Sequence, residues 1–172
     1  MRIVGIDPGT AAVGFGVVER RGRSLVELWH GCLRTTPRES VQRRLGRIFD
    51  GCTEVLDEFE PDVVAIESLF FGANATAALA VGQARGVCIV VAERRGVDVH
   101  EYAPTTVKQA VAGWGRADKR QMQEMVRVIL GLEHVPRPDH AADALGLAIC
   151  HAASERHVMI TAHDRPAHRP MP

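Results

Sequence analysis

Acidic side chains and one imidazole stand at three separated points of this sequence. Asp7 and Glu67 each end a short apolar run, and a third group stands where a late helix is expected to begin: Asp139, His140 and Asp143. A carboxylate at the end of a buried strand costs free energy unless an opposite charge compensates it, and a bound cation is a common compensation. If the three points meet in the folded chain, they form one metal site lined by carboxylates.

The residue types at these points suit phosphodiester hydrolysis. On a helix, either Asp139 or His140 can share a face with Asp143, because residues three or four apart are neighbours. Carboxylate oxygens suit a hard ion such as Mg2+, and one imidazole among them also admits Mn2+. Two such ions about 4 Å apart activate water and stabilise the leaving oxygen of a phosphodiester. The sequence contains no Ser-His-Asp order and no Walker A loop that would indicate a different chemistry.

Aromatic and basic residues accompany these points. Phe70 and Phe71 follow Glu67 in an expected loop, where exposed rings would stack on bases or wedge between them; core packing is the alternative. The basic residues suited to hold phosphates are Lys108, Lys119 and Arg120. These positions favour a nucleic acid as the substrate.

The charges of the chain are unevenly distributed. The formal net charge of the 172 residues is zero, so whole-chain electrostatics do not indicate nucleic-acid binding. Residues 19–47, however, hold eight arginines against three glutamates, and residues 50–67 hold seven acids and no base. A neutral protein can present a basic face beside an acidic pocket, although from charge alone ordinary solvated helix faces are the favoured explanation.

The elements that must position these residues follow from the apolar pattern. Strands are expected at 2–7, 13–19, 25–33, 62–67 and 97–102. Helices are expected at 40–59, 74–95, from Pro104 to Gly113, 119–130 and 139–153. The first three strands should be antiparallel neighbours because their connections are short. The fold class is therefore α/β, a five-stranded mixed sheet with helices on both faces.

One domain is expected over residues 1–156, because no repeat or linker divides it. Residues 157–172 lack apolar periodicity and are expected to form a disordered tail. No apolar run approaches the ~20 residues that a membrane helix needs, and the start has no signal-peptide pattern. The four cysteines are far apart and are expected to be reduced thiols. A cytoplasmic protein without a membrane partner is expected.

Six stretches of the chain, in order and from residue 1 to about 151, resemble the RuvC family of bacterial Holliday junction resolvases. They are GIDPGT, AIES-LFF-x-x-N, GQARGV, EYAPTTVKQAVAG, K-x-Q-M-Q-x-M-V and HAADALGLAICH. The resemblance implies a ribonuclease H-like fold and a crossover junction endodeoxyribonuclease active in DNA recombination and repair. It also implies a homodimer that makes paired nicks across a four-way DNA junction and acts with the RuvA–RuvB branch-migration complex.

The resemblance also implies roles for particular residues. The family's four metal ligands match Asp7, Glu67, His140 and Asp143, with two Mg2+ ions per subunit and Mn2+ as a substitute. The third ligand is aspartate in many members and histidine in others, which leaves Asp139 as the fallback. Phe70 matches an aromatic that unstacks bases at the crossover, and the basic residues near the cut strand match Lys108 and Lys119.

Several alternatives remain open from the sequence. The small-sided stretch 74–95 suits either burial in the domain centre or a helix-on-helix dimer contact. GIDPGT is also similar to the first phosphate loop of actin-like ATPases, which would need a second similar domain. A DNA-binding module without chemistry is a third hypothesis. A ribonuclease H-like nuclease acting on structured RNA is the nearest alternative by fold.

Overall fold

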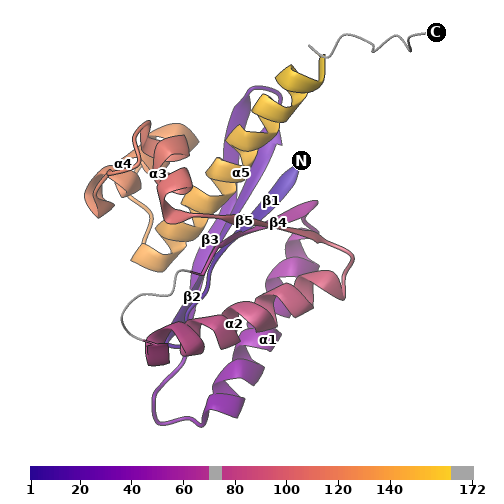
Figure 1. Ribbon diagram of the computed structural model, residues 1–172, viewed down its shortest axis with the longest axis vertical. Coiled ribbons are helices and arrows are strands. Elements are labelled where there is room, and N and C mark those ends of the chain that lie inside the picture. Colours follow the sequence, from indigo (N-terminus) through magenta and orange to yellow (C-terminus); the bar gives the residue numbers. More distant parts are fainter. Residues whose placement is uncertain (70–74, 164–172) are drawn as a thin grey trace, which may run out of the picture.

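A five-stranded mixed sheet forms the centre of the computed structural model, which describes residues 1–69 and 75–163 (Figure 1). Its strands are β1 (Arg2–Asp7), β2 (Ala12–Arg21), β3 (Ser24–Arg34), β4 (Val63–Glu67) and β5 (Asp98–Tyr102), in the order β3-β2-β1-β4-β5. The first three strands are antiparallel neighbours, whereas β4 and β5 run parallel to β1. Both the expected fold class and the expected pairing of the first three strands are confirmed.

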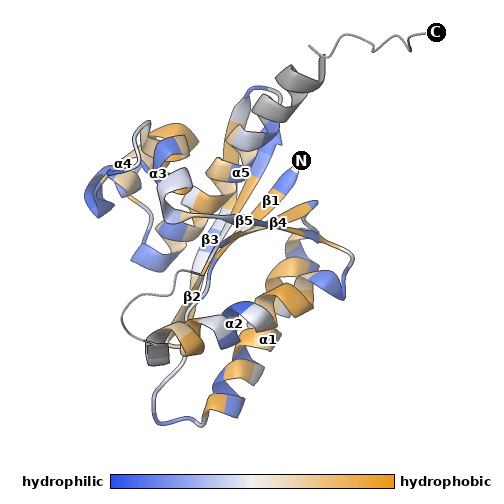
Figure 2. Ribbon diagram, in the orientation of Figure 1, coloured by the Kyte–Doolittle hydropathy of each residue, from blue (hydrophilic) through white to orange (hydrophobic). Residues whose placement is uncertain are grey.

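Helices cover both faces of the sheet. The layer on one face consists of α1 (Val41–Phe59) and α2 (Ala75–Glu93), and the layer on the other face consists of α3 (Pro104–Ala112), α4 (Lys119–Leu130) and α5 (Asp139–His163). Alternate residues of β1 divide between two cores, because successive strand side chains point to opposite faces. Val4 and Ile6 pack with α1 and α2, whereas Ile3 packs with α3, α4 and α5. Much of β1 and β4 is hydrophobic, as Figure 2 shows.

Local signals in the sequence set several helix boundaries. Ser40 caps α1 by accepting a hydrogen bond from the backbone of Arg43, and Asp118 forms a capping box with Gln121 at the start of α4. α5 continues to His163, past the predicted end at 153, because residues 156–163 contain no glycine or proline to stop a helix. Of the expected tail 157–172, residues 157–163 continue α5, and residues 164–172 lie outside the described part of the chain. In that described part, no helix is long and apolar enough to span a membrane.

Three glycines allow α5 to lie directly on the backbone of the sheet. A Cβ atom at Gly14 of β2 would lie 1.9 Å from the carbonyl oxygen of His140, and one at Gly5 of β1 would lie 1.9 Å from that of Ala144. A Cβ at Gly16 would lie 2.6 Å from the nitrogen of Leu145. Only hydrogen atoms fit in these gaps, so the three positions determine how closely α5 approaches the sheet.

Candidate metal centre

The carboxyl ends of β1 and β4 bring two of the expected ligands to one edge of the sheet. β1 and β4 are parallel neighbours, with Ile6 opposite Ile66, so Asp7 and Glu67 follow at the same level. The alternation of strand side chains directs both toward the face that α3, α4 and α5 cover. Two carboxylates distant in sequence are therefore neighbours because of strand pairing.

The start of α5 supplies the other expected ligands. Nδ1 of His140 lies 2.6 Å from Oδ2 of Asp7. One ligand atom each from Asp7, His140 and Asp143 lie within 4.8 Å of one another. His140 and Asp143 are three residues apart on the helix and can face the same ion. We call Asp7, Glu67, His140 and Asp143 the candidate metal centre.

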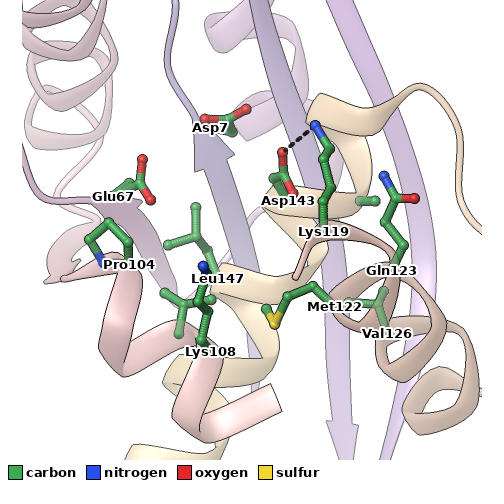
Figure 3. A pocket seen from close by; sticks show the side chains of 12 residues that line it. Asp7, Glu67, Pro104, Lys108, Lys119, Met122, Gln123, Val126, Asp143 and Leu147 are labelled. Carbon is green, nitrogen blue, oxygen red and sulfur yellow. Dashed lines mark ion pairs between the residues drawn. The ribbon is translucent and has the colours of Figure 1, made fainter. Parts of the chain in front are cut away.

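Glu67 lies beside this group, in a cavity of about 240 Å3 that Asp7 and Asp143 also line (Figure 3). Burial raises the pKa of Glu67 to about 7, and the charges of Asp7 and Asp143 act in the same direction. Burial and the charge of Asp7 also raise the pKa of Asp143, whereas Lys119 and His140 oppose the rise. Mutual repulsion and desolvation of this kind are relieved by a divalent cation.

The donor set fits such a cation. Carboxylate oxygens with one imidazole are ligands for Mg2+ or Mn2+, whereas a structural zinc site has four sulfur or nitrogen ligands. The cavity exceeds the ~30 Å3 that a water molecule occupies in the liquid severalfold, which leaves room for ions with part of their hydration shell. Both the chemistry and the space agree with the expected metal site.

Two lysines face the acids from α3 and α4. Nζ of Lys119 lies 3.1 Å from Oδ2 of Asp139 and 3.6 Å from Oδ2 of Asp143. Although desolvation works against it, the hydrogen bond to Asp139 and the charges of both acids raise the pKa of Lys119. Lys108 lines the same cavity (Figure 3), whereas Arg120 is not among the lining residues. A phosphate bound in this cavity, beside the acids, would lie close to the positive charges of both lysines.

Asp139, the fallback ligand, is engaged elsewhere. Its Oδ1 accepts hydrogen bonds from Gln123, at 3.0 Å, and from Arg137, at 2.8 Å, while Oδ2 pairs with Lys119. The hydrogen bonds from Lys119 and Gln123 lower the pKa of Asp139, in contrast to the raised pKa of Asp143. The geometry thus favours His140 over Asp139 as the third ligand.

Some expected site residues cannot be placed, and others were missed. Phe70 and Phe71 fall in 70–74, outside the described residues. Sequence reasoning overlooked Gln123, a buried polar side chain of α4 that lines the cavity. It also overlooked Arg85 of α2, whose Nε donates to the carbonyl oxygen of Glu67 at 3.1 Å. A polar residue on the inward side of a helical pattern was the available signal for both.

Most of the chain is similar to proteins named as crossover junction endodeoxyribonucleases. The family model described as crossover junction endodeoxyribonuclease RuvC matches residues 3–151. The protein of that name from Rubrobacter xylanophilus is 52% identical over 164 residues, covering 95% of this chain and 92% of the relative. That from Chloroflexus aggregans is 55% identical over 152 residues, covering 88% and 93%.

A solved structure extends the similarity to the fold. Thermus thermophilus RuvC, in complex with Holliday junction substrate, matches with a TM-score of 0.88 and 43% identity, covering 92% of this chain and 96% of that one. The ribonuclease H-like fold expected from the sequence is thereby confirmed. The alternative of a nuclease acting on structured RNA has no support in these similarities.

Proposed function

Because the chain belongs to the RuvC family of crossover junction endodeoxyribonucleases, we propose that the candidate metal centre binds the divalent cations of its active site. The protein is a Holliday junction resolvase, an endonuclease that acts on four-way DNA junctions in recombination and repair. Its metal ligands, in this proposal, are Asp7, Glu67, His140 and Asp143. The assignment rests on one observation. Donor residues from three separate elements, β1, β4 and α5, come together in the fold, and most of them line one cavity.

Two Mg2+ ions are the proposed cofactors, with Mn2+ as a substitute. When bound, they would activate a water molecule and stabilise the leaving oxygen of a phosphodiester, giving 5′-phosphate and 3′-hydroxyl ends. Lys108 and Lys119 line the same cavity as the carboxylates, with Lys119 in contact with Asp143, and in this proposal they hold the scissile phosphate there. Gln123 and Asp139 hold Lys119 at the cavity wall through the contacts described above. Phe70 and Phe71, with Arg120, complete the proposed contacts to DNA.

A homodimer would deliver two such centres to a substrate that has two-fold symmetry, which explains paired, symmetric nicks. The exposed side of α2 supports a helix-on-helix contact. Leu79 and Val90 are exposed large hydrophobic residues three turns apart on this helix, and nothing lies within 4 Å of a Cβ built at Gly86 between them. Small residues of this kind allow close helix packing. Cooperation with RuvA–RuvB and a cytoplasmic location belong to the same proposal and rest on the family resemblance.

A nicking assay tests the proposal. A labelled four-way junction, a linear duplex, a flapped DNA and a structured RNA are each incubated with the protein and Mg2+, then with Mn2+. The junction alone should receive paired nicks at symmetric positions. Asp7→Asn should lose nicking by about a thousandfold or more yet bind the junction within a few-fold of the parent protein. Retained nicking by Asp7→Asn at ordinary Mg2+ would refute the ligand assignment.

A further inference from the structure

A dense group of arginines lies at the junction of β3 and α1. We call this group the arginine patch; it consists of Arg34, Arg38, Arg43, Arg44 and Arg47. Between residues 34 and 47, Glu39 is the single acid. Because the net charge of the whole chain is zero, attraction of a polyanion must come from local groups of this kind.

The arginine patch lies at the same end of the sheet as the candidate metal centre. Arg34 ends β3 opposite Ala12, where β2 begins, and Asp7 ends β1 beside Gly14. Neighbouring strands lie about 4.8 Å apart, so the ends of β3 and β1 are separated by roughly 10 Å, or about three base-pair steps of duplex DNA. The centre and the patch can therefore contact one duplex together.

Hydrogen bonds connect the arginine patch to the turn that follows Asp7. The backbone N–H of Thr35 donates to the carbonyl oxygen of Ala11 at 3.0 Å, and its hydroxyl donates to that of Thr10. Nε of Arg44 donates in turn to Oγ1 of Thr35 at 2.9 Å. These contacts fix the position of the patch relative to the active-site edge.

Most of the arginine patch is available to a ligand. Arg47 pairs with Glu39, but among the residues that the structure describes Arg34, Arg38 and Arg43 form no ion pair with a carboxylate. These three side chains belong to exposed residues. Apart from Glu39, their segment contains no acid. The next six acids come later in the sequence, in residues 50–62.

The charge distribution along α1 is the reverse of the one that stabilises a helix. Acids favour the first turn and bases the last, because of the helix dipole. α1 has no acid in its first turn and no base in its last; instead Arg43 and Arg44 lie near its start, and Asp57 and Glu58 near its end. Helix stability therefore does not explain why arginines gather at this end of α1.

We propose that the arginine patch binds phosphates of a duplex arm of the junction as that arm leaves the active site beside β3. The assignment rests on the proposed function and adds a second basic surface to it. Lys108 and Lys119 belong to the α3–α5 layer, whereas the patch belongs to the α1–α2 layer on the other face of the sheet. DNA contacting both groups crosses the edge of the sheet where the carboxylates lie. Phosphate contacts of this kind fix position without reading sequence.

The test compares an Arg38→Gln/Arg43→Gln variant with a matched control, Arg21→Gln/Arg94→Gln. Arg21 and Arg94 lie at the opposite end of the sheet, so the control removes the same charge away from the active-site edge. Fluorescence anisotropy measures binding of a labelled four-way junction in chelator, from 50 to 300 mM salt. The patch variant should bind about tenfold more weakly at 100 mM, with a slope of log K against log salt shallower by about 2. Equal slopes and affinities for both variants would overturn the proposal.

Two further measurements separate the arginine patch from the chemistry. With the patch variant in saturating excess over the junction, the single-turnover nicking rate should stay within about twofold of that of the parent, since the metal ligands are unchanged. A large loss of this rate would contradict a pure binding role. Neutral methylphosphonates are placed on the arm within one helical turn of the nick. They should lower the affinity of the parent protein for the junction but not that of the patch variant. An equal loss of affinity in both proteins would refute the contact. If the proposed function itself fails, the parent protein does not nick the junction at all.

Discussion

His140 places its Nδ1 atom 2.6 Å from Oδ2 of Asp7, although 133 residues separate the two in sequence. One residue ends a central strand and the other begins the last helix, so neither belongs to a loop. The backbones of such elements are held by the packing of the core, so the two side chains start from well-defined positions. The candidate metal centre is therefore largely formed by the fold itself.

The first prediction separates the two candidates for the third ligand. His140→Ala should lower junction nicking by more than about a hundredfold, the upper range for loss of an outer-shell group. Asp139→Asn should stay within about tenfold of the parent, because it loses only its pairing with Lys119 and Arg137. Nicking is measured over a Mg2+ titration. The opposite ranking would make Asp139 the ligand.

The second prediction concerns Lys119, whose amino group lies 3.6 Å from Asp143. Lys119→Met should bind Mn2+ several-fold more tightly without DNA, because a positive charge that repels the ion is removed. The same variant should nick about a hundredfold more slowly, because it loses a phosphate contact. Lys108→Met is the control: Lys108 lines the cavity but forms no ion pair with Asp143 in the described chain, so only nicking should fall. Calorimetry measures the ion affinity; unchanged affinity in Lys119→Met would contradict the proposed competition.

The third prediction concerns pH and Glu67, whose pKa rises from 4.5 to about 7 on folding. The folded state then binds the proton more tightly than the unfolded state, so this group favours folding at low pH. That contribution is lost as pH rises from about 4.5 through about 7. In chelator, the free energy of unfolding relative to Glu67→Gln should fall over this range and level off above it. Urea unfolding at several pH values measures the difference; a constant difference would show that Glu67 titrates normally.

The fourth prediction concerns the contact between β2 and α5. Gly14→Ala places a Cβ 1.9 Å from the carbonyl oxygen of His140, so the start of α5 must move. The expected loss is about 1–3 kcal/mol of stability, as for overpacked cores, together with most of the nicking activity. Gly46→Ala in α1 meets nothing within 4 Å and should be neutral or stabilise by up to about 1 kcal/mol. Thermal unfolding and nicking of both variants check this; a fully active Gly14→Ala would show that α5 can shift freely.

Much of this architecture was predictable because its signals are local. The apolar run of β1, the cap at Ser40 and the break at Gly113 mark element boundaries within the sequence itself. The proposed ligands at Asp7 and Glu67 were suggested by acids at strand ends, where burial makes a carboxylate conspicuous. The pairing of β1 with β4 was then enough to bring Asp7 and Glu67 together.

Other features depend on contacts that no local pattern specifies. Which of Asp139 and His140 faces Asp7 depends on the rotation of α5 about its axis, and the glycines of β1 and β2 fix that rotation. The roles of Gln123 and Arg85 depend equally on neighbours distant in sequence, a carboxylate of α5 and a carbonyl of β4. The helix after 153 was missed because its apolar pattern is weak, although nothing in it breaks a helix.

The close packing of α5 against three glycines of β1 and β2 affects how variants of this enzyme are interpreted. Gly5, Gly14 and Gly16 take no part in chemistry, yet a methyl group at any of them pushes against the main chain of the helix that bears two proposed ligands. In a saturation library scored by cell survival after DNA damage, these glycines should be as intolerant as the carboxylates. Loss of function at such a position would reflect a steric clash with α5. The survival score does not distinguish this clash from the loss of a catalytic group, whereas the structure does.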